Sequence, residues 1–74
     1  MKRKLYVAEI HRDLFENSEI LRLYVETDDR TNLEDKLKKY LKVNYNLQNI
    51  FIHSYAVDKE DAEIVKRVAT VLMI

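Results

Sequence analysis

Residues 31–47, with the sequence TNLEDKLKKYLKVNYNL, decide the fold that we expect for this chain. Thr31 and Glu34 have the spacing of a capping box, in which each side chain bonds to a backbone N–H at the other's position. After it, apolar side chains recur every three or four residues and form one stripe, while lysines occupy the opposite side of the helix. The stripe consists of Leu33, Leu37, Tyr40, Leu41 and Leu47. The pattern predicts an amphipathic helix that begins at Thr31 and ends near Asn44 to Asn46, where Asn replaces Gly in a left-handed cap.

Three segments around this helix have the composition of β-strands: Lys4 to Arg12, Ile20 to Thr27, and Ile50 to Val57. The second segment alternates apolar and polar residues, as a strand with one buried face does. The first segment does not alternate cleanly, which indicates apolar contacts on both of its sides. Residues 13–18 connect the first two strands as a hairpin loop without glycine.

The end of the chain allows two predictions. From Ala62 to Met73 every apolar residue falls on one arc of a helical wheel, and Asp58 can cap such a helix. The alternative is a terminal strand within residues 68–74, because Val, Thr and Ile favour sheets and no helix breaker precedes them. We expect the helix.

Together these elements predict an α+β two-layer sandwich with the order ββαβα, formed by one domain over residues 1–74. A right-handed crossover places the third strand beside the first, which is then the central strand. We expect a small, mostly antiparallel three-stranded sheet with two helices on one face. In the alternative, residues 68–74 add a fourth strand.

The composition excludes several kinds of site. The 74 residues contain no Gly, no Pro and no Cys. Without Cys the chain cannot form disulfides, thiolate zinc sites or iron–sulfur clusters, and without Gly it lacks the glycine-rich loops that bind phosphates. Turns must therefore use Asn, Asp and Ser. The basic residues 2–4 precede only four apolar ones, which is too short for a signal peptide or a membrane span, so we expect a cytoplasmic protein without a membrane partner.

His11 and His53 are the candidates for acid–base chemistry, because the predicted sheet places them on adjacent strands. The carboxylates and hydroxyl nearest to them in sequence are Glu9, Asp13, Ser54 and Asp58. No nucleophile elbow or oxyanion loop accompanies them, and neither predicted helix carries a His-x-x-x-His or Glu-x-x-His pair. We interpret both histidines as ordinary strand residues and expect no enzyme, no catalytic residues, no cofactor and no metal.

The predicted terminal helix has an apolar arc about twice as wide as the 100° stripe that packs against one sheet. A chain this short buries only about 60% of its surface, so part of that arc should stay exposed and form an interface, most simply in a homodimer. Leu14 and Phe15, in the hairpin loop, are a second apolar anchor. The expected protein interface consists of Val65, Val68, Ala69, Leu72, Met73, Ile74, Leu14 and Phe15.

Thirteen basic and thirteen acidic residues give a net charge of zero, but their distribution along the chain is uneven. Basic residues gather at the N-terminus and on one side of the first helix, and with a strand tyrosine they could bind phosphates and stack on bases. These residues are Lys2, Arg3, Lys4, Lys38, Lys39, Lys42 and Tyr24. Zero net charge attracts nucleic acid weakly at long range, so this partner is our second choice.

Our leading hypothesis is a non-enzymatic protein-interaction module. A small chain rich in Asn, Lys, Ile and Tyr has the general character of phage- or plasmid-type accessory proteins. We therefore expect an inhibitor of a host defence or regulatory factor, anti-CRISPR-like or anti-restriction-like in its role. The alternative is a small nucleic-acid-binding regulator that uses its lysine-rich helix and sheet tyrosines.

Overall fold

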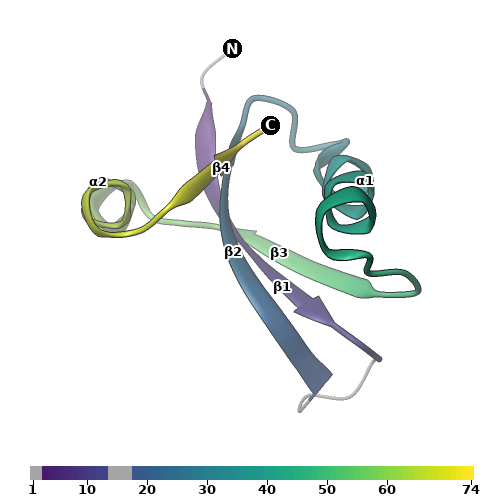
Figure 1. The fold of residues 1–74 in the computed structure, drawn as a ribbon. Helices are drawn as coiled ribbons and strands as arrows, with labels where there is room; N and C mark the ends of the chain where they lie inside the picture. The colour runs from purple at the N-terminus through teal and green to yellow at the C-terminus, as the bar shows by residue number, and fades with distance from the viewer. Residues whose placement is uncertain (1–2, 14–17) are drawn as a thin grey trace.

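A computed structural model describes residues 3–13 and 18–74 and shows one four-stranded sheet with two helices (Figure 1). The elements in chain order are β1 (Lys4–His11), β2 (Glu19–Thr27), α1 (Leu33–Tyr45), β3 (Phe51–Ala56), α2 (Lys59–Val68) and β4 (Val71–Met73). The strands lie in the order β3-β1-β2-β4. The predicted α+β class is confirmed, and so is the alternative in which the end of the chain forms a fourth strand.

β1 is a central strand that is buried on both faces. It pairs antiparallel with β2 on one side and with β3 on the other. Four consecutive residues, Leu5 to Ala8, are buried, although their side chains alternate between the two faces of the sheet. The uneven apolar pattern of this segment therefore has the cause that the sequence predicts.

One face of the sheet packs against α1. The apolar stripe of the helix supplies Leu33, Leu37 and Leu41, all fully buried. On the sheet they meet Tyr6, Ala8, Ile10 and Val25. This cluster is the hydrophobic core.

Asparagine and aspartate build both ends of α1. The helix begins at Leu33 with Asn32 as its N-cap, and the Asp29 carboxylate accepts the Asn32 N–H at 3.3 Å, in place of the predicted box at Thr31. At the other end Asn46 adopts the left-handed conformation (φ 53°), as predicted, and Asn49 also has a positive φ of 56°. Asn accepts this conformation more readily than other non-Gly residues, which is why the chain turns here without Gly.

The single helix predicted from Ala62 to Met73 is wrong, because α2 ends at Val68 and Ala69 is extended. β4 then adds to the sheet parallel to β2, so the expected three-stranded sheet is wrong as well. The strand is stabilised by what it buries: Leu72 and Ile74 pack against the core. Alternation along the strand turns Val71 and Met73 to the other face.

The prediction that both helices cover one face is also wrong: α1 lies on one face and α2 on the other (Figure 1). β2, β3 and β4 all run in the same direction, because β2 and β3 are each antiparallel to β1 and β4 is parallel to β2. The crossover through α1 moves from β2 to β3, and the crossover through α2 moves back across the sheet to β4. Right-handed crossovers in opposite directions must pass on opposite faces.

The orientation of β4 predicts different effects at neighbouring residues. We expect Leu72→Ala to lower the free energy of unfolding by about 2 kcal/mol, the lower end of the range for leucines in a core. Met73→Ala, at a side chain that is 58% exposed, should change it by less than about 0.5 kcal/mol. Urea denaturation of both variants measures the difference. Equal losses at the two positions would contradict the assigned strand.

Candidate functional site

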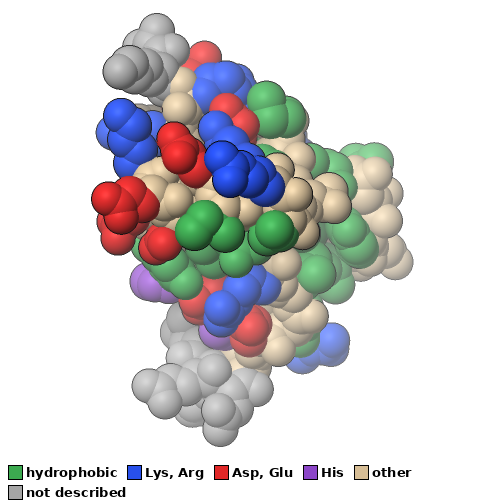
Figure 2. Space-filling model, turned by 90° about the vertical axis from the view of Figure 1, so that its left-hand side faces the viewer, with side chains coloured by type: hydrophobic (Ala, Val, Ile, Leu, Met, Phe, Trp, Pro, Cys, Tyr) green, Lys and Arg blue, Asp and Glu red, His purple; other side chains and the backbone are tan. Residues whose placement is uncertain are grey.

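The sheet face that carries α2 is the candidate site, and we call it the α2 face. Alternation along the strands places Glu9 and His11 of β1, Arg22 and Tyr24 of β2, and His53 and Tyr55 of β3 on this face. α2 covers only part of it and has no buried residue itself. Hydrophobic side chains gather in the middle of this view of the molecule, with charged groups around them (Figure 2). The face is therefore both incompletely covered and chemically mixed.

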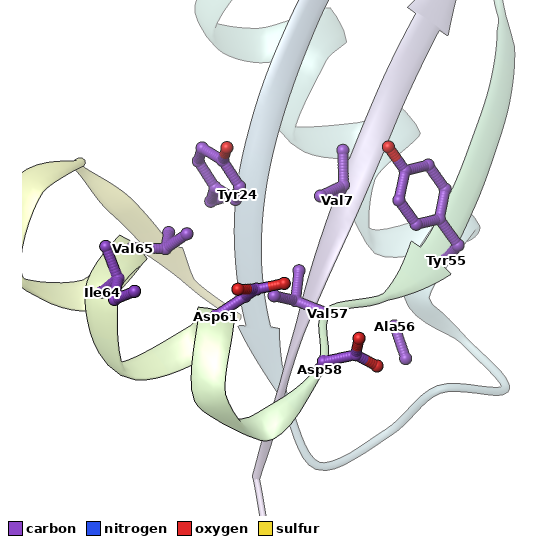
Figure 3. A pocket seen from close by; sticks show the side chains of 9 residues that line it. All are labelled: Val7, Tyr24, Tyr55, Ala56, Val57, Asp58, Asp61, Ile64 and Val65. Atoms are coloured by element: carbon purple, nitrogen blue, oxygen red, sulfur yellow. The ribbon is translucent and has the colours of Figure 1, made fainter.

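A groove of about 520 Å³ lies between α2 and the sheet. Val7 is central in it, since Tyr24 and Tyr55 are its cross-strand neighbours on the two sides. Ile64 and Val65 of α2 line the groove from the helix, and the carboxylates Asp58 and Asp61 lie where the helix begins (Figure 3). Ala56 and Val57 complete the lining. The groove thus combines an apolar interior with two tyrosines and two carboxylates.

A polar network occupies the rest of the α2 face, with Glu9 at its centre. One Glu9 oxygen lies 3.4 Å from His11 Nε2, and the other lies 3.5 Å from Arg22 Nη2. Arg22 also binds Glu19 at 3.0 Å. Ser18 Oγ donates to the Asp13 carbonyl at 2.8 Å and lies 3.4 Å from His11 Nδ1. Each of these charged side chains therefore has a counterpart of opposite charge or a hydrogen-bond partner.

The network changes the acidity of its central carboxyl. Desolvation raises the pKa of Glu9, but the hydrogen bond with His11, the charge of Arg22 and a hydrogen bond from Tyr55 together lower it below its ordinary value of 4.5. Tyr55, which lines the groove, is therefore close enough to this network to affect the Glu9 carboxyl.

Glu9, His11 and Glu19 bring three possible metal ligands within 4.8 Å of one another. Arg22 already contacts both carboxylates, however, and its guanidinium supplies the positive charge that a metal ion would bring. We therefore assign this cluster to the ion-pair network. His53 lies on the same face as His11, one strand away as predicted, and its ring packs against Tyr55 with 5.9 Å between ring centroids.

The structure places some of the residues predicted for a protein interface on the α2 face and others in the core. Val65 lines the groove, Val68 and Met73 are 78% and 58% exposed on the side of the sheet that carries α2, and Ala69 is partly buried. Leu72 and Ile74 instead pack against the core, because they belong to β4 and its end. The remaining two predicted residues, Leu14 and Phe15, lie outside the described residues.

The residues predicted for nucleic-acid binding do not form one surface. Lys38, Lys39 and Lys42 are exposed on α1, whereas Tyr24 lies on the opposite side of the sheet. Arg3 donates hydrogen bonds to the carbonyls of Glu26 and Ile74, at 2.7 and 2.9 Å, and so ties β1 to the end of the chain. Lys4 is exposed at the start of β1, and Lys2 lies outside the described residues.

The predicted protein interface did not include Tyr55, Asp58, Asp61 or Ile64, which the structure places in the groove. Asp58 and Asp61 carried a signal, since residues three apart share one side of a helix. This side of α2 faces the sheet because the chain crosses over the sheet from β3 to β4. The prediction of one helix up to Met73 contained no such crossover, so it gave no reason to place these residues against the sheet.

Neither a protein-family model, nor a curated protein sequence, nor a solved structure matches this chain. Within residues 3–13 and 18–74, no helix is both long enough and apolar enough to cross a lipid bilayer.

The lowered pKa of Glu9 predicts a pH-dependent contribution to stability. Because the folded state favours the ionised carboxyl, the contribution is fully present above pH 4.5 and is lost as the pH falls through the lowered pKa. We expect Glu9→Gln to unfold at a lower temperature than the wild type at neutral pH, and the two midpoints to converge in acid. Circular dichroism melting curves across this range measure the effect. Glu34→Gln, at an exposed position of α1, is the control, and a difference between Glu9→Gln and wild type that does not shrink in acid would contradict the assignment.

Proposed function

We propose that this chain is a non-enzymatic protein-interaction module that binds its partner with the α2 face. The observation that carries the proposal is the distribution of exposed apolar side chains. Most of the large ones among the described residues belong to this side of the molecule: Phe51, Tyr55, Ile64, Val68 and Met73. Apolar patches of this kind on a small domain are typical of protein interfaces.

The energetics of α2 support the same proposal. The helix has no buried residue, so its contacts with the sheet bury little apolar surface. Full burial of a Val or Ile side chain contributes about 1.5–3 kcal/mol, and Ile64 and Val68 leave most of that contribution unused at 58% and 78% exposure. A partner that covered α2 would bury these two side chains, and the complex would gain that free energy. Nucleic acid fits this face less well, because the exposed lysines of α1 lie on the other side of the sheet.

The partner that we propose is a different protein, such as the host defence or regulatory factor that a phage- or plasmid-type inhibitor would bind. The homodimer expected from the sequence relied on an apolar arc that continued to Met73, and Leu72 and Ile74 now belong to the core. Self-association stays a prediction. Light scattering after size exclusion would reveal it as a mass of twice 8.9 kDa.

Val68 and Val43 allow a matched test of the α2 face, because they are 78% and 82% exposed on α2 and α1 respectively. We expect Val68→Lys to fold like the wild type, with its free energy of unfolding changed by less than about 0.5 kcal/mol, and to lose the partner. Val43→Lys should keep the partner. Wild type and both variants are immobilised, exposed to lysate of the source cells, and compared by quantitative mass spectrometry.

Proteins retained by wild type and Val43→Lys but absent from Val68→Lys would support the proposal. Retention of the same proteins by all three would contradict it. If the wild type is dimeric and only Val68→Lys is monomeric, the partner is a second copy of the chain.

A further inference from the structure

The groove between α2 and the sheet has the chemistry of a site for a basic side chain. We infer that it receives a lysine or arginine side chain presented by the partner protein. The inference rests on the proposed function and adds to it the chemistry of the partner. Three features of the groove carry it: the aromatic walls, the carboxylates at one end, and the apolar interior between them (Figure 3).

The aromatic walls come from two strands that flank β1. Tyr24 and Tyr55 are both cross-strand neighbours of the buried Val7, so the two rings rise on either side of it. The Tyr55 ring also contacts the His53 ring, with 5.9 Å between the ring centroids. A cation within about 6 Å of a tyrosine ring face is attracted by the ring quadrupole, and arginine and lysine are the usual cations in such contacts.

Asp58 and Asp61 place two carboxylates at the start of α2. Among the described residues, neither carboxylate forms an ion pair or a hydrogen bond, and Asp58 does not cap α2 with its side chain. Lys66 and Arg3, which lie on the same side of the sheet, both pair with Glu26 instead. The acids at the start of α2 are thus available to a partner.

The charge around these carboxylates is negative. Residues 58–63 contain four acids and one base, a net charge of −3. The N-terminus of a helix contributes roughly half a positive charge, which offsets only a small part of it. An anionic ligand would be repelled, and a purely apolar side chain would desolvate the carboxylates without pairing them.

Lysine and arginine match both parts of the groove, because each joins an apolar stem to a cationic head. The stem would lie along Val7, Ile64 and Val65, and the head would reach the carboxylates and the tyrosine rings. At about 520 Å³ the groove has room for such a side chain and for part of the segment that carries it.

The test uses the full chain, labelled with ¹⁵N, and blocked tripeptides as probes. Ala-Lys-Ala and Ala-Arg-Ala carry the basic side chain, and Ala-norleucine-Ala carries an apolar stem without the charge. At low ionic strength we expect both basic peptides to shift the amide resonances of Val7, Tyr24, Tyr55 and Asp61. Added salt should weaken these shifts, because the groove is open to solvent. The norleucine peptide should bind about tenfold more weakly.

Asp58→Asn combined with Asp61→Asn should weaken binding of the basic peptides by about tenfold. The Asp58 side chain makes no cap hydrogen bond to α2, and Asn suits the N-cap position as well as Asp, so this variant is expected to fold, and its dispersed amide spectrum checks that it does. Glu34→Gln combined with Asp35→Asn removes the same charge from the first turn of α1 and should leave binding unchanged.

Equal binding of the norleucine peptide, unchanged binding by the Asp58 and Asp61 variant, or shifts confined to α1 would each overturn the inference. The experiments distinguish a failure of this inference from a failure of the proposed function. Partner proteins lost from Val68→Lys but kept by the Asp58 and Asp61 variant would overturn the inference alone. Peptide binding in the groove, together with equal capture by the two lysine variants, would overturn the proposed function alone.

Discussion

The burial of β1 on both faces is the constraint on which the rest of the structure depends. Tyr6, Ala8 and Ile10 need cover on one face, and Leu5 and Val7 need it on the other. One helix cannot supply both, so the chain needs an element on each side of the sheet. The two crossovers pass over the sheet in opposite directions, so the right-handed connection that such units adopt places α1 on one face and α2 on the other. The arrangement of one helix on each side of the sheet therefore follows from the burial of β1 on both faces and from the right-handedness of crossover connections.

The two helices cover their faces of the sheet to different extents, and the candidate site lies on the face that is covered less. α1 has thirteen residues and buries three leucines completely, whereas α2 has ten and buries none. α2 therefore lies over the end of its face near Leu5 and Val7 and leaves Tyr55, His53 and Phe51 partly open. The groove is the space between this short helix and the sheet, and its lining comes from both, with Ile64 and Val65 on α2 and Val7, Tyr24 and Tyr55 on the strands.

Local patterns were enough to predict the parts of the fold whose causes are local. The stripe of α1, the two-sided burial of β1 and the left-handed turn at Asn46 all depend on residues within a few positions. β4 could not be predicted in the same way, because its apolar residues fit a helical arc and a strand equally well. What decides between them is pairing with β2, distant in sequence, and burial of Leu72 and Ile74 in a core that does not exist before the fold forms. The groove could not be predicted for the same reason. Asp58 and Tyr55 come together only because α2 crosses over the sheet, and the local sequence around each of them does not indicate this.

The polar half of the α2 face takes part in the same arrangement. Glu9 lies on the central strand between Arg22 and His53, and the His53 ring contacts the Tyr55 ring that forms one wall of the groove. An exposed tyrosine without such neighbours would sample several rotamers and would have to lose that freedom on binding. We therefore expect the network to restrict the neighbouring aromatic side chains, in addition to the modest stability that ion pairs at a partly exposed face contribute. This role of the network explains why charged residues occupy a sheet face whose proposed function depends on apolar and aromatic contacts.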